Sequence, residues 1–149
     1  MNQSLPSDAR QWGMWCHLSS LAWIVVPIPY AGLLAPLLIW LLKRDLHPFV
    51  DEQGKESINF QLSMAIYATV AALLGGGLFV LFFLGLITTS SDSSSSPDLF
   101  FAWFGQFFFT FLILPALVIL FETVLAIFAA IRASEGDVYR YPITLRFLK

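Results

Sequence analysis

The chain is poor in charged residues. Only 12% of its 149 residues are charged, about half the usual share of a soluble domain, whereas 58% are hydrophobic. The formal net charge of −2 leaves no excess of Lys and Arg to bind phosphate groups, which argues against a nucleic-acid partner. The composition indicates a membrane protein that interacts with the lipid bilayer.

Residues that could carry catalysis are also scarce. The chain has one cysteine, Cys16, and two histidines, His17 and His47. One thiol cannot form an intrachain disulfide, and no second sulfur or imidazole has the spacing of a metal site. Neither a Ser-His-Asp arrangement nor a phosphate-binding loop is present. We therefore expect a protein that is not an enzyme, with no metal and no cofactor.

Two long stretches are nearly free of charge. Residues 57–91 carry none, and residues 99–131 carry only Glu122. A helix needs about 20 apolar residues to cross the hydrocarbon core, so both stretches are long enough. Gly75-Gly76-Gly77 in the first stretch favours close helix packing over a hinge. We predict transmembrane spans at 57–87 and 99–132, joined by a Ser-rich external loop at 88–98.

The N-terminal third is apolar but interrupted by Pro27 and Pro29. Each proline lacks a backbone donor and disfavours helical angles in the residue before it. The apolar run that follows is about 18 Å long as a helix, short of the ~30 Å core. It belongs either to a helical hairpin, which we favour, or to a single broken crossing. The expected segments are a helix at 8–25, a turn at 26–30 and a short helix at 31–43.

The distribution of positive charge predicts the orientation. Lys and Arg gather in a polar segment at 43–56 and in the tail at 133–149, and none lies in the loop at 88–98. The positive-inside rule places the polar segment and the C-terminus in the cytoplasm. The expected fold is a single all-α membrane domain over residues 1–149, with about four helices. The first two form a short proline-broken hairpin and the last two are long transmembrane spans.

Glu122 is the strongest single candidate for a functional residue. It lies about 15 Å from the cytoplasmic end of its predicted helix, where a carboxylate is costly unless it is protonated or paired. It is either a proton or ion site or a neutral acid hydrogen-bonded between helices, and we favour the second. Its face is roughly shared by small residues, which suit close helix contact, namely Ala126, Ala129, Ala130 and Ala133. Whether His17 pairs with Glu122 stays open.

Further candidates lie in the polar segment and the tail. Asp51 and Lys55 have the i, i+4 spacing of a helical ion pair, with Asn59 one turn later. This spacing predicts an interfacial helix, either a solvated cap, which we favour, or a docking surface. In the tail, Arg140 and Tyr141 are expected at headgroup level as membrane anchors. The candidate functional residues are Glu122, His17, Asp51, Glu52, Lys55, Asn59, Gln61, Arg140 and Tyr141.

The same segments carry a family resemblance. The order Pro48-Phe49-Val50-Asp51-Glu52, then Gly54-Lys55-Glu56, then Asn59-Phe60-Gln61 is similar to the core of a bacterial family of small integral membrane proteins of unassigned function. That family is related to the twenty-kilodalton subunit of the chloroplast inner-envelope translocon (Tic). His17 and the segment 136–147 also resemble it. The resemblance implies a multi-pass protein of the bacterial inner (plasma) membrane with about four helices and no known catalysis.

These observations predict a non-catalytic membrane subunit, scaffold or factor in assembly or translocation. Its expected partners are other membrane proteins or further copies of itself. The alternative is a small ion- or proton-conducting channel or carrier that uses Glu122 within the membrane.

Overall fold

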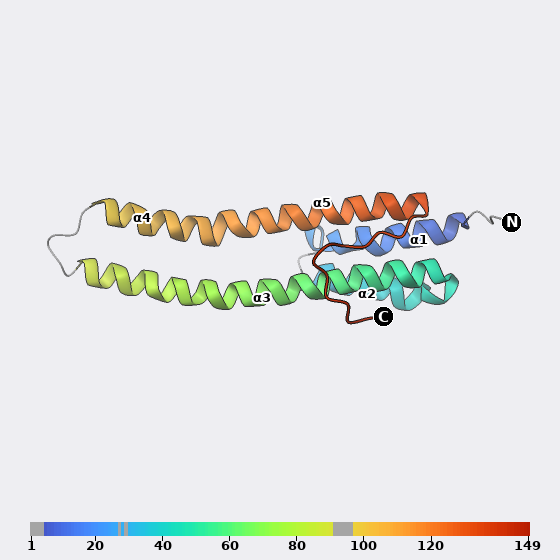
Figure 1. Cartoon of the computed structure of the whole chain (residues 1–149), viewed down its shortest axis with the longest axis horizontal. Helices are drawn as coiled ribbons and strands as arrows, with labels where there is room; N and C mark the ends of the chain where they lie inside the picture. The colour runs from blue at the N-terminus through green and yellow to red at the C-terminus, as the bar shows by residue number, and fades with distance from the viewer. Residues whose placement is uncertain (1–4, 27, 29, 91–96) are drawn as a thin grey trace. The chain divides into compact units, whose positions relative to one another are not determined.

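A computed structural model describes residues 5–26, 28, 30–90 and 97–149 (Figure 1). Over these residues the regular structure is helical, and no strand is present. The predicted all-α fold, with about four helices of which two are long and apolar, is confirmed. The elements are α1 (Ser7–Leu18), the 3-10 segment η1 (Ser19–Ile24), α2 (Ala31–Lys43), the 3-10 turn η2 (Arg44–Leu46), α3 (Pro48–Ser90), α4 (Pro97–Phe108), the π-helical segment η3 (Phe109–Ile113) and α5 (Leu114–Glu135).

Helices α1 and α2 pack against each other as a hairpin, which is the favoured one of the two predicted arrangements. The expected helix at 8–25 is α-helical only to Leu18. The Ser20 hydroxyl donates to the His17 carbonyl oxygen (2.6 Å), and the chain then tightens into η1. Gly32 permits the close approach of α2, because an added Cβ there would lie 2.8 Å from the Ser20 carbonyl oxygen. Pro27 and Pro29 lie outside the described residues.

Helix α3 runs unbroken through the polar segment and the first predicted span. The sequence placed an interfacial helix at 43–56 and a span at 57–87, but the break lies earlier, at His47, whose backbone is extended. The His47 Nδ1 accepts a hydrogen bond from the Phe49 N–H (3.1 Å), which satisfies one of the free donors at the start of α3. Much of the predicted loop at 88–98 lies outside the described residues.

Helices α4 and α5 are joined through η3 without an interruption. The π-helical turn lies next to Pro115, which has no N–H to donate to the preceding turn. A widened turn accommodates the missing bond, so the predicted span at 99–132 is a continuous helix with one irregular segment.

The chain divides into two compact units. Unit 2 comprises Ile66–Phe121, and unit 1 comprises residues 1–65 and 122–149. Within unit 2, α3 and α4 meet through aromatic rings, such as Phe82 and Trp103 with centroids 6.1 Å apart. The helices over Pro48–Thr88 and Phe101–Glu135 are long and apolar enough to cross a membrane. In each helix, only 6% of an apolar stretch of 18 residues is buried in protein. Their side chains therefore face outward, as lipid-facing side chains do.

Only part of the glycine triplet contacts another helix. An added Cβ at Gly75 would lie 3.9 Å from the Phe111 ring, whereas at Gly76 and Gly77 it would meet nothing within 4 Å. The close packing predicted from the triplet is therefore absent at Gly76 and Gly77, and α3 passes through all three residues without a hinge.

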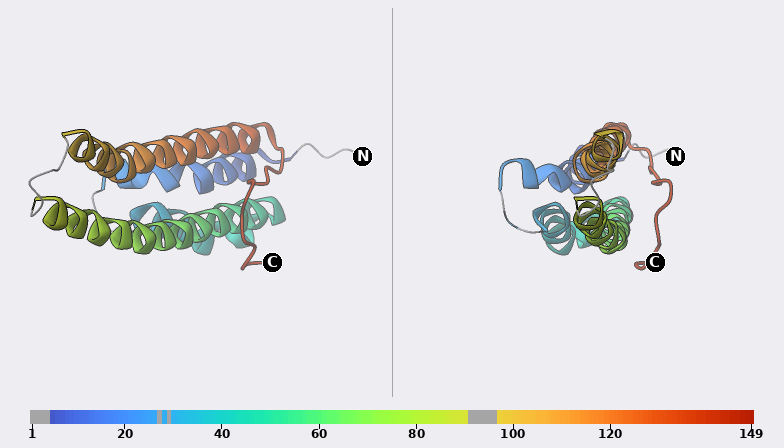
Figure 2. Two further views of the ribbon diagram at one scale, coloured as in Figure 1. Left: turned by 60° about the vertical axis from the view of Figure 1, so that its left-hand side comes forward. Right: turned by 90° about the vertical axis from the view of Figure 1, so that its left-hand side faces the viewer.

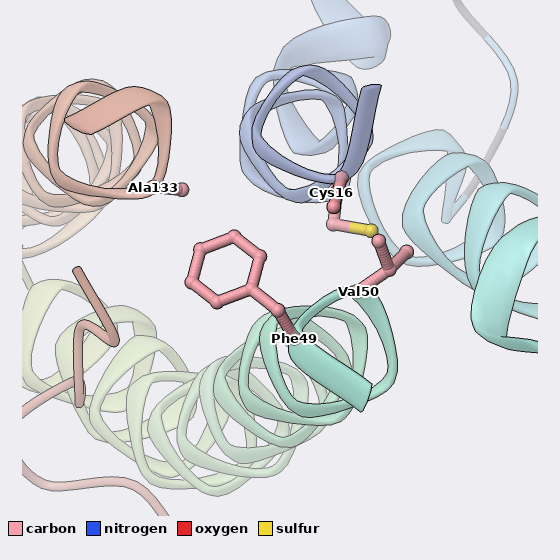
Figure 3. Close-up of a cluster of buried hydrophobic side chains, with 5 residues drawn as sticks. Cys16, Phe49, Val50 and Ala133 are labelled. Atoms are coloured by element: carbon pink, nitrogen blue, oxygen red, sulfur yellow. The ribbon is translucent and has the colours of Figure 1, made fainter. Parts of the chain in front are cut away.

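Unit 1 gathers α1, α2, the first turns of α3 and the last turns of α5 side by side (Figure 2). Its apolar core includes Cys16, Phe49, Val50 and Ala133 (Figure 3). Phe49 projects from the start of α3 into the space between α1 and α5. The predicted small-residue face of α5 is buried here, because Ala126, Ala129, Ala130 and Ala133 are at most 2% exposed.

Candidate functional site

The tail, defined here as Asp137–Lys149, lies beside α3 in unit 1 (Figure 1). It leaves α5 through Gly136, whose φ of 92° is a conformation that glycine adopts without strain. The Asp137 N–H donates to the Arg132 carbonyl oxygen (3.0 Å), which closes the end of the helix. The tail has no helix or strand of its own, so its backbone groups need other partners.

Polar side chains of α3 supply those partners. Glu56 Oε1 accepts a hydrogen bond from the Tyr141 N–H (2.9 Å), and Ser63 Oγ accepts one from the Leu145 N–H (2.8 Å). Asn59 Oδ1 accepts from the N–H groups of Phe147 (3.0 Å) and Leu148 (2.8 Å), while Asn59 Nδ2 donates to the Leu148 carbonyl oxygen (2.9 Å). These side chains recur every three or four residues, so one face of α3 holds the tail by its backbone.

A buried hydrogen-bond chain joins α1 to this face. His17 Nε2 donates to Gln53 Oε1 (2.6 Å), and Gln53 Nε2 donates to the Asp137 carbonyl oxygen (3.0 Å). The amide oxygen of Gln53 can only accept, which assigns the His17 proton to Nε2. His17 Nδ1 therefore accepts from the Tyr141 hydroxyl (3.0 Å). The direction of every bond is consistent with a neutral imidazole.

Burial governs the acid–base properties of this cluster. Desolvation lowers the pKa of His17 to about 4, outweighing the hydrogen bond to Gln53, which acts in the opposite direction. Desolvation also raises the pKa of the Tyr141 hydroxyl well above its ordinary value. The Tyr141 ring stacks on Phe60 with centroids 4.0 Å apart. Tyr141 is thus an uncharged aromatic anchor of the tail that is buried in the protein of unit 1, whereas the sequence predicted a side chain in contact with lipid headgroups.

Charged side chains border the docked tail. Arg146 Nε lies 3.7 Å from Glu56 Oε2, and Arg140 Nη2 lies 4.0 Å from Glu52 Oε1. The acids belong to α3 and the bases to the tail, so the charges of the two surfaces are complementary. Both arginines are about half exposed or more, so each pair is worth little in stability.

The predicted ion pair of Asp51 and Lys55 is present, with Nζ 2.6 Å from Oδ2. Asp51 Oδ1 also accepts a hydrogen bond from the Trp40 indole N–H (2.8 Å), so the pair connects α3 to α2. Gln61 lies toward α2 as well, since an added Cβ at Gly32 would lie 3.5 Å from Gln61 Oε1. These residues tie the hairpin to α3 and are separate from the tail site.

Glu122 stands apart from the cluster. It is half-buried, and its side chain forms no hydrogen bond or ion pair with the residues that the structure describes. The open question of a pair with His17 is answered, because Tyr141 and Gln53 occupy both ring nitrogens. Within the described residues, no group of His, Cys, Asp and Glu could hold a metal ion.

The structure thus assembles five of the predicted residues, namely His17, Glu52, Asn59, Arg140 and Tyr141. Sequence reasoning missed Gln53, Glu56 and Ser63, which contact the tail directly. A signal for them was present. Together with Asn59 they form a polar stripe at helical spacing on a helix that continues into an apolar span.

The fold and the site define a class of protein: a small all-α bacterial membrane protein that has a helical unit closed by a tail and two long apolar helices. Residues 8–148 match the magnetosome magnetite crystal formation protein family (MamF/MmsF), and the chain belongs to this family. No curated protein and no solved structure matches the chain significantly. The predicted kinship with small bacterial membrane proteins is confirmed at this level, whereas nothing supports a relationship to the Tic subunit.

Proposed function

We propose that the protein is a non-catalytic scaffold of the magnetosome membrane that supports magnetite crystal formation by binding other membrane proteins or further copies of itself. The observation that carries this proposal is that the polar side chains between α1, α3 and the tail bond to the protein itself. The side chains of His17, Gln53, Glu56, Asn59 and Ser63 are engaged in hydrogen bonds to the tail or to one another. A site that fastens its own chain is suited to presenting a fixed surface rather than to converting a substrate.

The distribution of charge supports a membrane orientation. All eight Lys and Arg residues lie in the segments of unit 1, residues 1–65 and 122–149. In the proposed threading unit 1 is cytoplasmic, and the two helices of unit 2 cross the bilayer. The α3 residues from Ile66 to Ser90 extend about 37 Å, enough for the ~30 Å core with some tilt.

This threading changes the position proposed for Glu122. Unit 2 ends at Phe121, so Glu122 begins the part of α5 that packs in unit 1. The crossing then ends next to this carboxylate, at the membrane boundary and not at mid-bilayer. A proton relay through the core would need further ionisable groups. Apart from Tyr67, the sequence of Ile66–Phe121 contains only Asp92 and Asp98, which fall in the polar stretch between the two apolar runs.

Complementation tests the scaffold proposal. A magnetite-forming bacterium lacking its own family member receives the wild-type chain, Asn59→Ala or Glu122→Gln, and crystal size is measured by electron microscopy. We expect Asn59→Ala to reduce crystal size, because it releases the surface that the tail completes, and Glu122→Gln to match the wild type. Loss of crystals with Glu122→Gln, together with proton flux through reconstituted protein that this change abolishes, would favour the channel alternative instead.

A further inference from the structure

The tail-binding face of α3 recognises features that a second chain could supply equally well. The side chain of Asn59 bonds to backbone atoms of the tail at both of its polar atoms. Glu56 and Ser63 each accept a hydrogen bond from a backbone N–H of the tail, and the Gln53 amide nitrogen donates to a backbone carbonyl oxygen there. Backbone recognition holds an extended peptide without reading most of its side chains. The face thus has the properties of a peptide-binding site that is occupied by the chain's own tail.

Side-chain features narrow the peptide to one like the tail. Tyr141 fills a place between Phe60 and His17 and is only 4% exposed. Outside this anchor, Arg140 and Arg146 lie opposite Glu52 and Glu56 of α3. A matching ligand is therefore an extended, basic peptide with a tyrosine at the position of Tyr141. The tail of another copy meets all three conditions.

The connection and conformation of the tail favour exchange. Only Gly136 separates α5 from the first bonded residue, Asp137, so a change in the backbone angles at one flexible position redirects the whole segment. Ile143 has a φ of 54°, which is strained for a β-branched residue, and it lies between the anchored residues Tyr141 and Leu145. A short hinge is a setting in which identical segments swap between copies.

We propose that the tail of one copy docks on α3 of another, so that exchange of Asp137–Lys149 links copies of the protein into an assembly. This inference rests on the proposed scaffold function and names its partner as a second copy of the same chain. The contacts made across copies are the ones that unit 1 makes within one chain. An exchanged pair therefore keeps the contacts between the tail and α3 and gives up those at the hinge, where the Asp137 N–H bonds to the Arg132 carbonyl oxygen.

Cross-linking between two distinguishable chains tests the exchange. Both chains carry Cys16→Ala and different affinity tags, one adds Glu52→Cys, and the other adds Arg140→Cys. These two positions face each other across the docked tail and are exposed, so the changes leave the core intact. After co-expression, membranes are treated with a short bismaleimide. A product that carries both tags is expected, because only a tail on the α3 of the other chain brings the two thiols together.

Matched variants show whether the product depends on docking. Asn59→Ala in the Glu52→Cys chain removes three hydrogen bonds to the tail, and we expect the doubly tagged product to fall about tenfold or more. Gln61→Ala, on the same helix but without a bond to the tail, should leave its yield unchanged. The proposal is overturned if cross-links form only when both cysteines are in one chain, or if Asn59→Ala has no effect on the doubly tagged product.

A second measurement avoids altered α3 residues. A fluorescent peptide with the sequence of Asp137–Lys149 is added to the full chain carrying Tyr141→Ala, which weakens its own tail. Saturable binding that is lost when the peptide also carries Tyr141→Ala supports exchange, and absence of binding contradicts it. Crystal formation is measured separately in cells. If the tails cross-link between copies but crystals are unaffected by the loss of the protein, the scaffold proposal fails and the exchange stands. If no cross-link between copies forms, the exchange itself fails.

Discussion

At the scale of single residues, local spacing revealed only local contacts. The ion pair of Asp51 and Lys55 was predictable because its partners are one helical turn apart. The bond between His17 and Tyr141 joins residues at opposite ends of the chain, and no periodicity encodes it. Tyr141 was therefore assigned to the membrane surface on composition alone. What the sequence could not show is that the tail forms no helix or strand of its own and that side chains of α3 bond to its backbone.

The neutral state of His17 gives a pH-dependent stability. The pKa of this imidazole is lowered to about 4 in the folded protein, against an ordinary value of 6.5. Between these values the unfolded chain binds a proton that the folded chain does not, so stability falls as the pH decreases from about 6.5 to about 4 and then levels off. The loss amounts to at most about 3 kcal/mol.

Thermal unfolding in detergent across this pH range measures the effect. We expect the melting temperature to decrease on acidification for the wild type. In His17→Gln the decrease should be much smaller, because the titrating group is gone. His47→Asn is the matched control, since His47 lies outside the cluster and asparagine can also cap α3. An equal slope in the wild type and His17→Gln would contradict the assignment.

At the scale of elements, the positions of proline and of charged residues predicted where helices lie. They did not predict that α3 continues through the change from polar to apolar composition. Helix α2 occupies 31–43, where the apolar run and the flanking charges placed the short helix. Helix α3 joins two segments that the change from polar to apolar composition had separated. Its polar face is buried by the tail, so polarity there marks an intramolecular contact and not exposure to water. Composition alone cannot distinguish these two environments.

Glycines in α3 show where this helix packs. An added Cβ at Gly54 would overlap the base of the Trp40 side chain, which is held in place by its hydrogen bond to Asp51. We expect Gly54→Ala to destabilise the protein by about 1–3 kcal/mol through overpacking of α2 against α3. Gly76→Ala is the matched control in the same helix, because its Cβ would enter open space. It should be neutral or slightly stabilising, since alanine is the better helix former.

Denaturation in detergent, followed by tryptophan fluorescence, measures both variants. A loss of stability in Gly54→Ala alone supports the packing of α2 on α3. Equal effects of the two changes would show instead that the response reflects helix propensity and not contact.

At the scale of the whole molecule, the sequence predicted that this is a membrane protein with two long apolar helices. It did not predict how the chain divides into units. Long apolar runs predict the two spans, because a segment that crosses the lipid must satisfy its backbone hydrogen bonds internally as a helix. The division into two units was not predicted, since it depends on which helical turns gather around α1 and the tail. The charge distribution follows that division, with every Lys and Arg in unit 1, and it is the basis of the proposed orientation.

Cysteine accessibility tests this orientation. In a Cys16→Ala background, Asp45→Cys places a thiol in the basic unit at a side chain that is 95% exposed, and Asp98→Cys places one at the start of α4. If the helices of unit 2 cross the bilayer once each, the two positions lie on opposite sides of the membrane. In a bacterial host that forms no magnetosomes, so that the chain resides in the inner membrane, a membrane-impermeant maleimide added to intact spheroplasts should label Asp98→Cys and leave Asp45→Cys unlabelled until the membrane is permeabilised. Labelling of both positions from one side would mean that unit 2 does not span, because a helix of about 37 Å that crosses the core cannot return its two ends to the same surface.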